Sequence, residues 1–325
     1  MTISAPVRSS ARCTSDHGVN TVYTTTITNE ARRRGIRIGV IDPVTPIFTL
    51  RHGGRSVRCY NALTDHVGAV TFHMAQNKRL ANTFLKQAGF PVPDQVSFTD
   101  LPAAERFLRR HRVIVVKPCT QWGGRGVSVA VRTVTELKAA IRKAQRFEEE
   151  IILEQCLRGA DYRLIFVDFN FVAAIRRRPA TVIGNGRDTL RVLISRRNRE
   201  ERPRDPSHII PLDAETGRNL VALGLSWETV PPAGREVQVR LTSNYHTGGS
   251  IDMVTDSVSR KLVALARRAV RALNVPVIGI DFLVDEKTGR FRIIELSPDL
   301  AISPPEGEAV AKRFLDYLFP ETAAR

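Results

Sequence analysis

The chain has 325 residues, of which 42% are hydrophobic and 25% are charged, which is the composition of a globular protein with a sizeable core. Its net charge of +16 would suit a nucleic-acid-binding protein. However, only 6% of the residues are aromatic and the basic residues are spread along the chain, so we do not expect nucleic acid to be the main ligand. No apolar run approaches the length of a membrane helix, the first residues lack the apolar core of a secretory signal, and the cysteines form no paired motif. We therefore expect a cytoplasmic protein without membrane contact, disulfides or a cysteine-bound zinc ion.

The start of the chain is expected to form a small segment ahead of the main domain. Residues 1–20 are rich in serine and arginine and poor in acids, and we expect them to be disordered. Residues 21–75 predict a small α/β segment with a short helix at NEARRRG and a strand at IRIGVID. A hairpin follows, and Gly53 and Gly54 are expected to form its turn.

The next elements lead to a lysine and a glycine-rich loop. The segment QNKRLANTFLKQAG predicts a helix, because Leu80, Phe84 and Leu85 fall on one face. The run VIVV then predicts a buried strand that ends at Lys117. A buried strand does not readily end in an ammonium group unless an anion lies nearby, so we expect an anionic ligand here. The loop after Lys117 is not a Walker A element, since no G-K-[ST] follows. Its glycines are Gly123, Gly124 and Gly126.

The rest of the chain predicts an α+β fold with a largely antiparallel sheet. A helix over 101–110 precedes the Lys117 strand, and a helix capped by Thr133 or Thr135 follows the loop. The segments EIILEQ and DYRLIFVDFNFVAAIRRR predict three strands. Prolines scattered through 198–236 predict long loops in place of regular structure. An amphipathic helix at SVSRKLVALARRAVRALN, a hairpin turning at EKTG and a final helix over 306–318 complete the chain.

The last hairpin brings two carboxylates together. Pairing its strands across EKTG places Asp281 opposite Glu295 to within about one register step, and Ser297 shares the face of Glu295 because strand side chains alternate. Adjacent carboxylates repel unless a cation or a shared proton lies between them, and Mg²⁺ binds carboxylate and phosphate oxygens. Together with the lysine and the glycine loop, this hairpin predicts that the anion is a nucleoside triphosphate bound with Mg²⁺. The alternative is that Asp281 merely ends a strand and Glu295 pairs with an arginine.

These motifs resemble the ATP-grasp carboxylate–amine ligases, in particular the ATP-grasp portion of cyanophycin synthetase and ligases of the glutathione-synthetase type. The resemblance extends from MAQNKRLANTFLKQAGFPVP to IIELSPD, and it includes GGRGV, RRRPATVIGNG, VRLTSNYHTGG and GIDFLV. It implies an ATP-grasp fold in which two α+β subdomains enclose ATP. The implied domain covers 76–320, with a small nucleotide-closing subdomain at about 112–180.

The resemblance also assigns roles to individual residues. Those implied to bind ATP, through phosphate, adenine or ribose, are Lys78, Lys117, Gly123, Gly124, Gly126, Glu154, Leu157, Asp161 and Arg177. The metal ligands implied for Mg²⁺, with Mn²⁺ as an alternative ion, are Asp281, Glu295 and Ser297, and the reacting acyl group is assigned to Arg240 and Asn244 with the backbone near Gly248 and Gly249. Two of the nucleotide assignments stay open. Asp161 could simply pair with Arg163, and Arg176 or Arg178 could take the phosphate role in place of Arg177.

The implied reaction joins a carboxylate to an amine through an acyl phosphate and forms an amide or peptide bond. An amino acid or a short acylated peptide is the expected carboxylate, and a homodimer is an open alternative to a monomer. The family ends its metal motif as E-x-N, whereas this chain has Ser297 in place of the asparagine. This departure supports a second reading, in which the chain is a non-catalytic ATP-binding protein on a decayed ligase fold.

Overall fold

The computed structural model describes residues 22–42, 44–300, 302 and 306–323. It divides into two compact units, one made of the chain up to Asp65 together with the residues from Ala301 onward, and the other of His66–Leu300. The predicted boundaries differ from this division, because the chain from His66 already belongs to the second unit and the last helix belongs to the first. The prediction for residues 1–20 lies outside the described residues.

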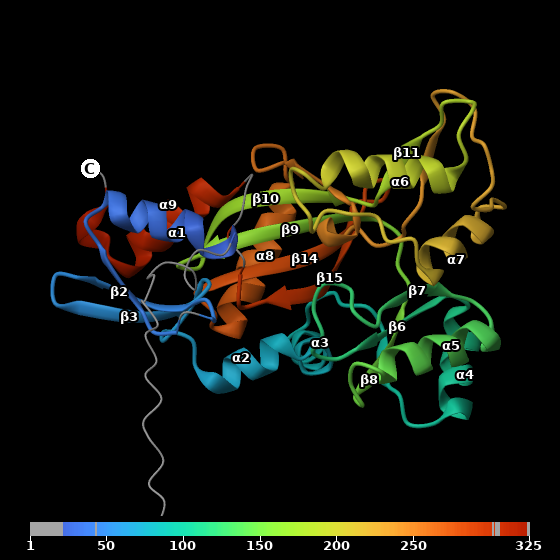
Figure 1. Cartoon of the computed structure of the whole chain (residues 1–325). Coiled ribbons are helices and arrows are strands. Elements are labelled where there is room, and N and C mark those ends of the chain that lie inside the picture. The colour runs from blue at the N-terminus through green and yellow to red at the C-terminus, as the bar shows by residue number, and fades with distance from the viewer. Residues whose placement is uncertain (1–21, 43, 301, 303–305, 324–325) are drawn as a thin grey trace, which may run out of the picture. The chain divides into compact units, whose positions relative to one another are not determined.

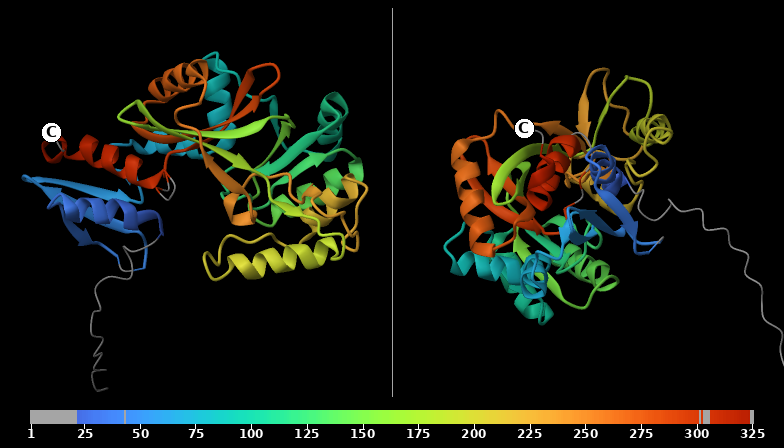
Figure 2. Two further views of the ribbon diagram at one scale, coloured as in Figure 1. Left: turned by 90° about the horizontal axis from the view of Figure 1, so that it is seen from above. Right: turned by 90° about the vertical axis from the view of Figure 1, so that its left-hand side faces the viewer.

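The first unit packs two helices on a small antiparallel sheet. Figure 2 shows the first helix, in blue, beside the last long helix, in red. Gly53 and Gly54 have φ values of 52° and 80°, as the predicted hairpin turn requires. Buried Phe48, Leu50 and Phe314 contribute to the core of this unit. In sheet order the strands are β1 (Arg37–Val40), β2 (Ile47–His52), β3 (Arg55–Tyr60) and β4 (Leu63–Thr64), and the helices are α1 (Val22–Arg33), α9 (Gly307–Leu318) and the 3₁₀ turn η2 (Pro320–Thr322).

The second unit is built around a five-stranded antiparallel sheet. Its order is β13 (Ser250–Met253), β10 (Asn170–Arg178), β9 (Ala160–Val167), β14 (Val277–Asp285) and β15 (Arg290–Ser297). Alternate residues such as Leu164, Ile280 and Phe282 are buried in a core shared with α8 (Arg260–Leu273), which packs on one face of the sheet (Figure 1). The helices α2 (Ala69–Gln76) and α3 (Lys78–Gln87) complete this core. On the opposite face, buried apolar residues such as Ile165 and Ile175 occupy one end, and the polar side chains of Arg163 and Asp281 lie toward the other.

A four-stranded sheet in the same unit carries the glycine loop. Its order is β5 (Gln95–Ser97), β8 (Ile151–Gln155), β6 (Ile114–Pro118) and β7 (Ser128–Val131), with α4 (Leu101–His111) and α5 (Val134–Gln145) packed on it. Thr133 caps α5 in a capping box with Glu136, which decides between the two predicted caps. The predicted closing subdomain extended to residue 180. However, β9 pairs with β14 and β10 pairs with β9 in the five-stranded sheet, so the four-stranded sheet ends at Gln155.

The proline-rich segment is more regular than its sequence predicts. It contains α7 (Ala214–Ala222), and α6 (Leu190–Glu201) overlaps its start, while β11 (Thr181–Ile183) pairs with β12 (Glu236–Gln238). Buried Ile210, Leu220 and Val237 join these elements in a small core. The prediction of long loops was wrong for α7, because the prolines all lie outside this short helix, which Asp213 caps and tertiary packing supports. The 3₁₀ turn η1 (Tyr245–Thr247) follows.

Candidate functional site

The polar face of the five-stranded sheet gathers residues from four adjacent strands. Arg177 on β10 lies opposite Asp161 on β9, and Arg163 on β9 lies opposite Asp281 on β14. Asp281 in turn lies opposite Glu295 on β15, as predicted. Because alternate residues of a strand share a face, the antiparallel registers bring basic and acidic side chains into one cluster.

Two arginines hold Asp281, which is only 1% exposed. Arg163 donates from Nε and Nη2 to the two carboxylate oxygens over 2.6 and 2.9 Å, and Arg177 donates to Oδ2 over 2.8 Å. Burial alone would raise the pKa of Asp281, but the two guanidinium groups hold it well below its usual range. The Asp281 carboxylate is therefore ionised and fully engaged by cations in this structure.

Asp161 and Ser297 complete the arginine cluster. Arg177 donates to Asp161 Oδ1 over 2.7 Å, so the partner of Asp161 is Arg177 and not Arg163. Burial raises the pKa of Asp161, and the charge of Asp281 adds to that effect. Arg163 donates to Ser297 Oγ over 3.0 Å, so the hydroxyl at the departure from the family motif accepts a hydrogen bond from a cation.

Two local features of the strands make this cluster fit. A Cβ at Gly279 would lie 3.2 Å from Cδ1 of Leu300, which is a tight contact, and 3.4 Å from Cδ of Arg163, so the glycine packs closely between these two side chains. The pairing of β14 with β15 shifts by one residue after Asp281, where Phe282 pairs with Ile293. This bulge buries Ile293 in the core while Glu295 stays partly exposed on the polar side.

Lys78 links this cluster to the glycine loop. Its Nζ lies 3.1 Å from Glu295 Oε1 and donates to the carbonyl of Gln121 over 2.7 Å. Asn77 caps α3, so Lys78 is the first residue of the helix and its backbone N–H donates to the carbonyl of Cys119. The structure thus brings together Lys78, a predicted metal ligand and the loop that follows Lys117.

Lys117 lies at the end of β6 and forms a buried ion pair. Lys117 and Glu154 are 7% and 5% exposed, and Nζ donates to Oε1 over 2.8 Å. Gln95 donates to the other oxygen of Glu154 over 3.0 Å. The anion expected at the end of this strand is therefore supplied, in this structure, by Glu154 itself. Leu157 lies in the connection between β8 and β9 and is partly buried.

The glycine loop has the backbone that its sequence predicts. Gly123, Gly124 and Gly126 all have φ between 67° and 76°, which side chains other than glycine rarely adopt. A Cβ at Gly126 would also lie 2.7 Å from Cγ of Pro118, so only glycine fits there. The Asn244 amide nitrogen lies 3.6 Å from the position that a Cβ of Gly124 would take. Asn244 is therefore next to the loop.

The residues assigned to the acyl group differ in their surroundings. Arg240 is 6% exposed, and the described partners of its guanidinium group lie at the start of α7 and not in the arginine cluster. Its Nη1 lies 2.5 Å from Asp213 Oδ1 and donates to Thr216 Oγ1 over 2.9 Å. The backbone N–H groups of Gly248 and Gly249 donate to the carbonyls of Tyr245 and Asn244. Both N–H groups are therefore engaged within the turn around η1 in this structure, and their assignment to the acyl group stays a prediction.

Several known proteins are similar in sequence to this chain. Cyanophycin synthetase of Trichormus variabilis is 30% identical over 315 residues, which cover 91% of this chain and 35% of that protein. The bifunctional glutathione biosynthesis protein GshAB of Listeria innocua is 29% identical over 312 residues, covering 90% of this chain and 40% of that protein. The chain thus spans well under half the length of these relatives. No protein-family model matches it.

Solved structures decide the fold. A bifunctional glutathione synthetase from Pasteurella multocida has a TM-score of 0.62 at 24% identity, covering 92% of this chain and 43% of that one. D-alanine–D-alanine ligase from Bacillus anthracis has a TM-score of 0.51 at 11% identity, covering 78% and 70%. This is the ATP-grasp fold of carboxylate–amine ligases. The predicted α+β class and the ATP-grasp resemblance are confirmed. Across the described part of the ATP-grasp chain, no helix is both long and apolar enough to cross a membrane.

One central residue of the arginine cluster was not predicted from the sequence. Arg163 contacts both Asp281 and Ser297, although it was considered only as a partner for Asp161. Its position two residues after Asp161 on a predicted strand was a usable signal, because both then lie on one face. The pairing of β9 with β14, which brings Arg163 to Asp281, joins strands far apart in the sequence and could not be predicted from local patterns.

The ion pairs of Asp281 predict a pH-dependent stability. We expect Asp281→Asn to lower the free energy of unfolding by about 3 kcal/mol at neutral pH, because it leaves buried guanidinium charges uncompensated. Since the folded-state pKa of Asp281 is held below the usual value of about 4, its ionised form stabilises the fold above about pH 4, and this contribution is lost as the pH falls further. Urea unfolding of both proteins at pH 7 and pH 3 measures the difference. An equal difference at the two pH values would contradict this account.

Proposed function

We propose that this protein is an ATP-dependent ligase that joins a carboxylate to an amine through an acyl phosphate and releases ADP. The proposal rests on one observation: the Lys78 ammonium contacts both the Gln121 carbonyl, next to the glycine loop, and the Glu295 carboxylate. The glycine loop, a lysine and the acids that we assign to Mg²⁺ are thus contiguous. The similarity to a cyanophycin synthetase and a glutathione biosynthesis protein supports the same reaction. We further propose amino acids or short peptides as the class of carboxylate and the cytoplasm as the compartment.

The cations of the site are suited to a triphosphate. Lys78, Arg163 and Arg177 are each paired with a carboxylate, namely Glu295 or Asp281. ATP would attract these cations to its phosphate oxygens, and positive charge there offsets the charge that develops as a carboxylate attacks the γ-phosphate. Closing the glycine loop would exclude water, which matters because acyl phosphates hydrolyse.

Mg²⁺ could bind Glu295 and Asp281 once their cations move to the phosphates of ATP. Glu295 is partly exposed and next to Asp281, and both offer the oxygen ligands that Mg²⁺ prefers. Ser297 Oγ lies on the same face and is a weaker oxygen donor. When bound, Mg²⁺ neutralises phosphate charge in the transfer step. In the structure each acid is paired with a cation that we assign to phosphate. Binding of ATP to these cations would free the acids for Mg²⁺, so we expect ATP and Mg²⁺ to bind cooperatively.

The acyl group and the amine would lie beyond the glycine loop. Asn244 is next to Gly124, so it is placed to contact a group that approaches the γ-phosphate. Arg240 is fixed by Asp213 and Thr216, so a role in charge stabilisation would need it to act from this anchored position. The amine then displaces phosphate from the acyl phosphate, and no enzyme nucleophile is required.

Hydroxylamine tests the acyl phosphate directly. With ATP, Mg²⁺ and a panel of amino acids or dipeptides, hydroxylamine should replace the amine and give a hydroxamate together with ADP. The expected result is hydroxamate formation with at least one carboxylate and none without ATP. ADP formation with no hydroxamate from any carboxylate would contradict an acyl phosphate.

A second candidate function is ATP binding without turnover. The observation that favours it is the engagement of Asp281 and Ser297 by arginines, together with the absence, among the residues that the structure describes, of any group of three His, Cys, Asp or Glu placed to hold a metal. A binding protein would take up ATP without forming ADP in the presence of any carboxylate and amine.

Replacing Ser297 separates these two functions. If position 297 ligates Mg²⁺ in an active enzyme, Ser297→Asn should preserve or increase the affinity for Mg²⁺, because an amide oxygen is the stronger donor and reaches further. Titration of Mg²⁺ into the ATP-bound protein by calorimetry measures this affinity, and ADP formation is followed in parallel. A non-catalytic protein should show no measurable change. Loss of turnover would instead show that the serine contacts substrate.

A further inference from the structure

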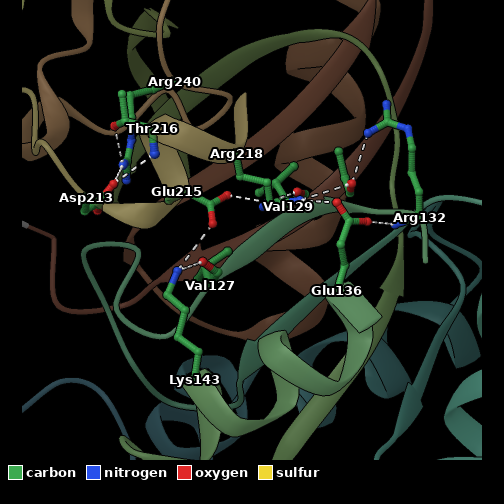
Figure 3. A network of polar contacts seen from close by, with 11 residues as sticks. Val127, Val129, Arg132, Glu136, Lys143, Asp213, Glu215, Thr216, Arg218 and Arg240 are labelled. Atoms are coloured by element: carbon green, nitrogen blue, oxygen red, sulfur yellow. Dashed lines mark hydrogen bonds and ion pairs between the residues drawn. The ribbon is translucent and has the colours of Figure 1, made fainter. Parts of the chain in front are cut away.

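A buried carboxylate at the start of α7 lies outside the ATP cluster. Glu215 is 9% exposed and belongs to the first turn of α7. Its Oε1 accepts a hydrogen bond from Arg218 Nη2 over 2.6 Å, and its Oε2 lies 3.5 Å from Lys143 Nζ on α5. A buried carboxylate is costly unless cations pair with it, so Glu215 fixes the positions of both cations (Figure 3).

The same two cations hold the backbone of β7. Lys143 donates to the carbonyl of Val127 over 2.7 Å, while Arg218 donates to the carbonyl of Val129 and, over 3.3 Å, to that of Ala130 (Figure 3). β7 is an edge strand of the four-stranded sheet, so one side of its backbone has no neighbouring strand. Side chains from α5 and α7 satisfy carbonyls that an edge strand otherwise leaves to solvent.

β7 needs this support because its backbone is irregular. Ala130 has φ of 56°, a left-handed conformation that costs about 1–2 kcal/mol for a residue with a Cβ. The pairing of β6 with β7 also shifts in register between Ile114 and Val116. The strand begins two residues after Gly126, so whatever holds β7 also sets where the glycine loop ends.

The first turn of α7 also anchors Arg240. Asp213 caps the helix by accepting from the backbone N–H of Thr216, and both residues bind Arg240 Nη1. One short helix thus contacts the exit of the glycine loop through Arg218 and the residue assigned to the acyl group through Asp213.

We propose that Glu215 and Arg218 are positioning residues of the ATP site, which hold β7 in the arrangement that lets the glycine loop close over ATP. This inference rests on the proposed function. By holding β7 from the helix that fixes Arg240, they couple the placement of the nucleotide loop to that of the acyl site. Among the residues that the structure describes, the side-chain partners of Glu215 and Arg218 include none of the predicted nucleotide ligands, so the two residues act through the backbone of β7.

Hydrogen exchange of the nucleotide-free protein tests the contact itself. We expect backbone amides of residues 123–131 to exchange on the order of tenfold faster in Arg218→Gln, because local opening becomes easier. The matched control is Arg204→Gln, which removes an i,i+3 pair with Glu201 of the same spacing. The control should leave exchange in 123–131 unchanged.

Nucleotide binding tests the positioning role. In a Trp227→Phe background, Trp122 of the glycine loop is the remaining tryptophan, and at 63% exposure it reports on the loop by acrylamide quenching. A non-hydrolysable ATP analogue with Mg²⁺ should protect Trp122 from quenching. In Arg218→Gln the dissociation constant for the ATP analogue should rise about tenfold. This is the change expected if the loop arrangement that can bind ATP falls to about a tenth of the population. Arg218→Lys keeps the charge but cannot donate to two carbonyls at once, so its dissociation constant for the analogue should rise by a smaller factor. This variant provides the test if Arg218→Gln does not fold.

The outcomes separate the two claims. Faster exchange and weaker binding in the Arg218 variants, with neither in Arg204→Gln, support the positioning role. Unchanged affinity overturns it even if exchange is faster, because the contact would then be structural only. If the wild-type protein binds no nucleotide, the proposed function fails and the inference fails with it, whatever the exchange result.

Discussion

In Lys117→Met, the affinity for ATP with Mg²⁺ should fall on the order of tenfold to a hundredfold, the loss expected for one charge-assisted contact to phosphate. The variant should also be less stable by about 3 kcal/mol, because Glu154 stays buried without its cation. Calorimetry with a non-hydrolysable ATP analogue measures the affinity, and urea unfolding measures the stability.

A double variant separates these two effects. Lys117→Met with Glu154→Gln removes the buried charge, and the amide can still hydrogen-bond to Gln95, so stability should return toward that of the wild type. Nucleotide affinity should stay low, because the phosphate-binding cation is still missing. If the double variant binds the nucleotide as well as the wild type, then Lys117 serves only to neutralise Glu154.

In Glu295→Gln, ADP formation should fall on the order of a hundredfold or more, because the charge that would hold Mg²⁺ beside the phosphates is lost. Nucleotide binding without Mg²⁺ should persist or become tighter, since Lys78 loses the carboxylate that competes with phosphate. The dependence of ADP formation and of nucleotide affinity on Mg²⁺ concentration measures both effects.

An acid elsewhere on the same sheet provides the matched control. Glu286 pairs with Arg176 and accepts from Tyr162 near the hairpin turn, away from the arginine cluster. Glu286→Gln makes the same chemical change and should leave the Mg²⁺ dependence unaltered. If Glu295→Gln retains wild-type turnover and Mg²⁺ dependence, Glu295 is not part of a metal site.

The sequence was sufficient where local pattern determines structure. The hairpin of β14 and β15 has a short turn, so its register and the pairing of Asp281 with Glu295 followed from alternation. The glycines after Lys117 predicted a loop, and the structure has one there, in which these glycines adopt positive φ. Among the three consecutive arginines, Arg177 joins the cluster on this face, while Arg176 and Arg178 pair with Glu286 and Asp252. The phosphate role of Arg177 stays a prediction.

The sequence was insufficient where long-range pairing determines structure. The partner of Lys117 is Glu154, and that of Asp281 is Arg163; strands distant along the chain bring each pair together. The helix α7 was hidden because its flanking prolines dominate the segment and its stability comes from packing against Ile210 and Val237. The anchoring of Arg240 by Asp213 depends on that helix and was missed with it.

The central claim is that ATP cleavage is coupled to amide formation. The most direct measurement is the rate of ADP release from ATP and Mg²⁺ over a panel of amino acid and dipeptide carboxylates, each with and without a second amino acid as the amine, and with the product identified by mass spectrometry. We expect at least one pair to give saturable ADP release with one amide formed for each ADP. The account would be contradicted by tight binding of ATP with no ADP release from any pair, or by ADP release that is the same with and without the amine and gives no amide.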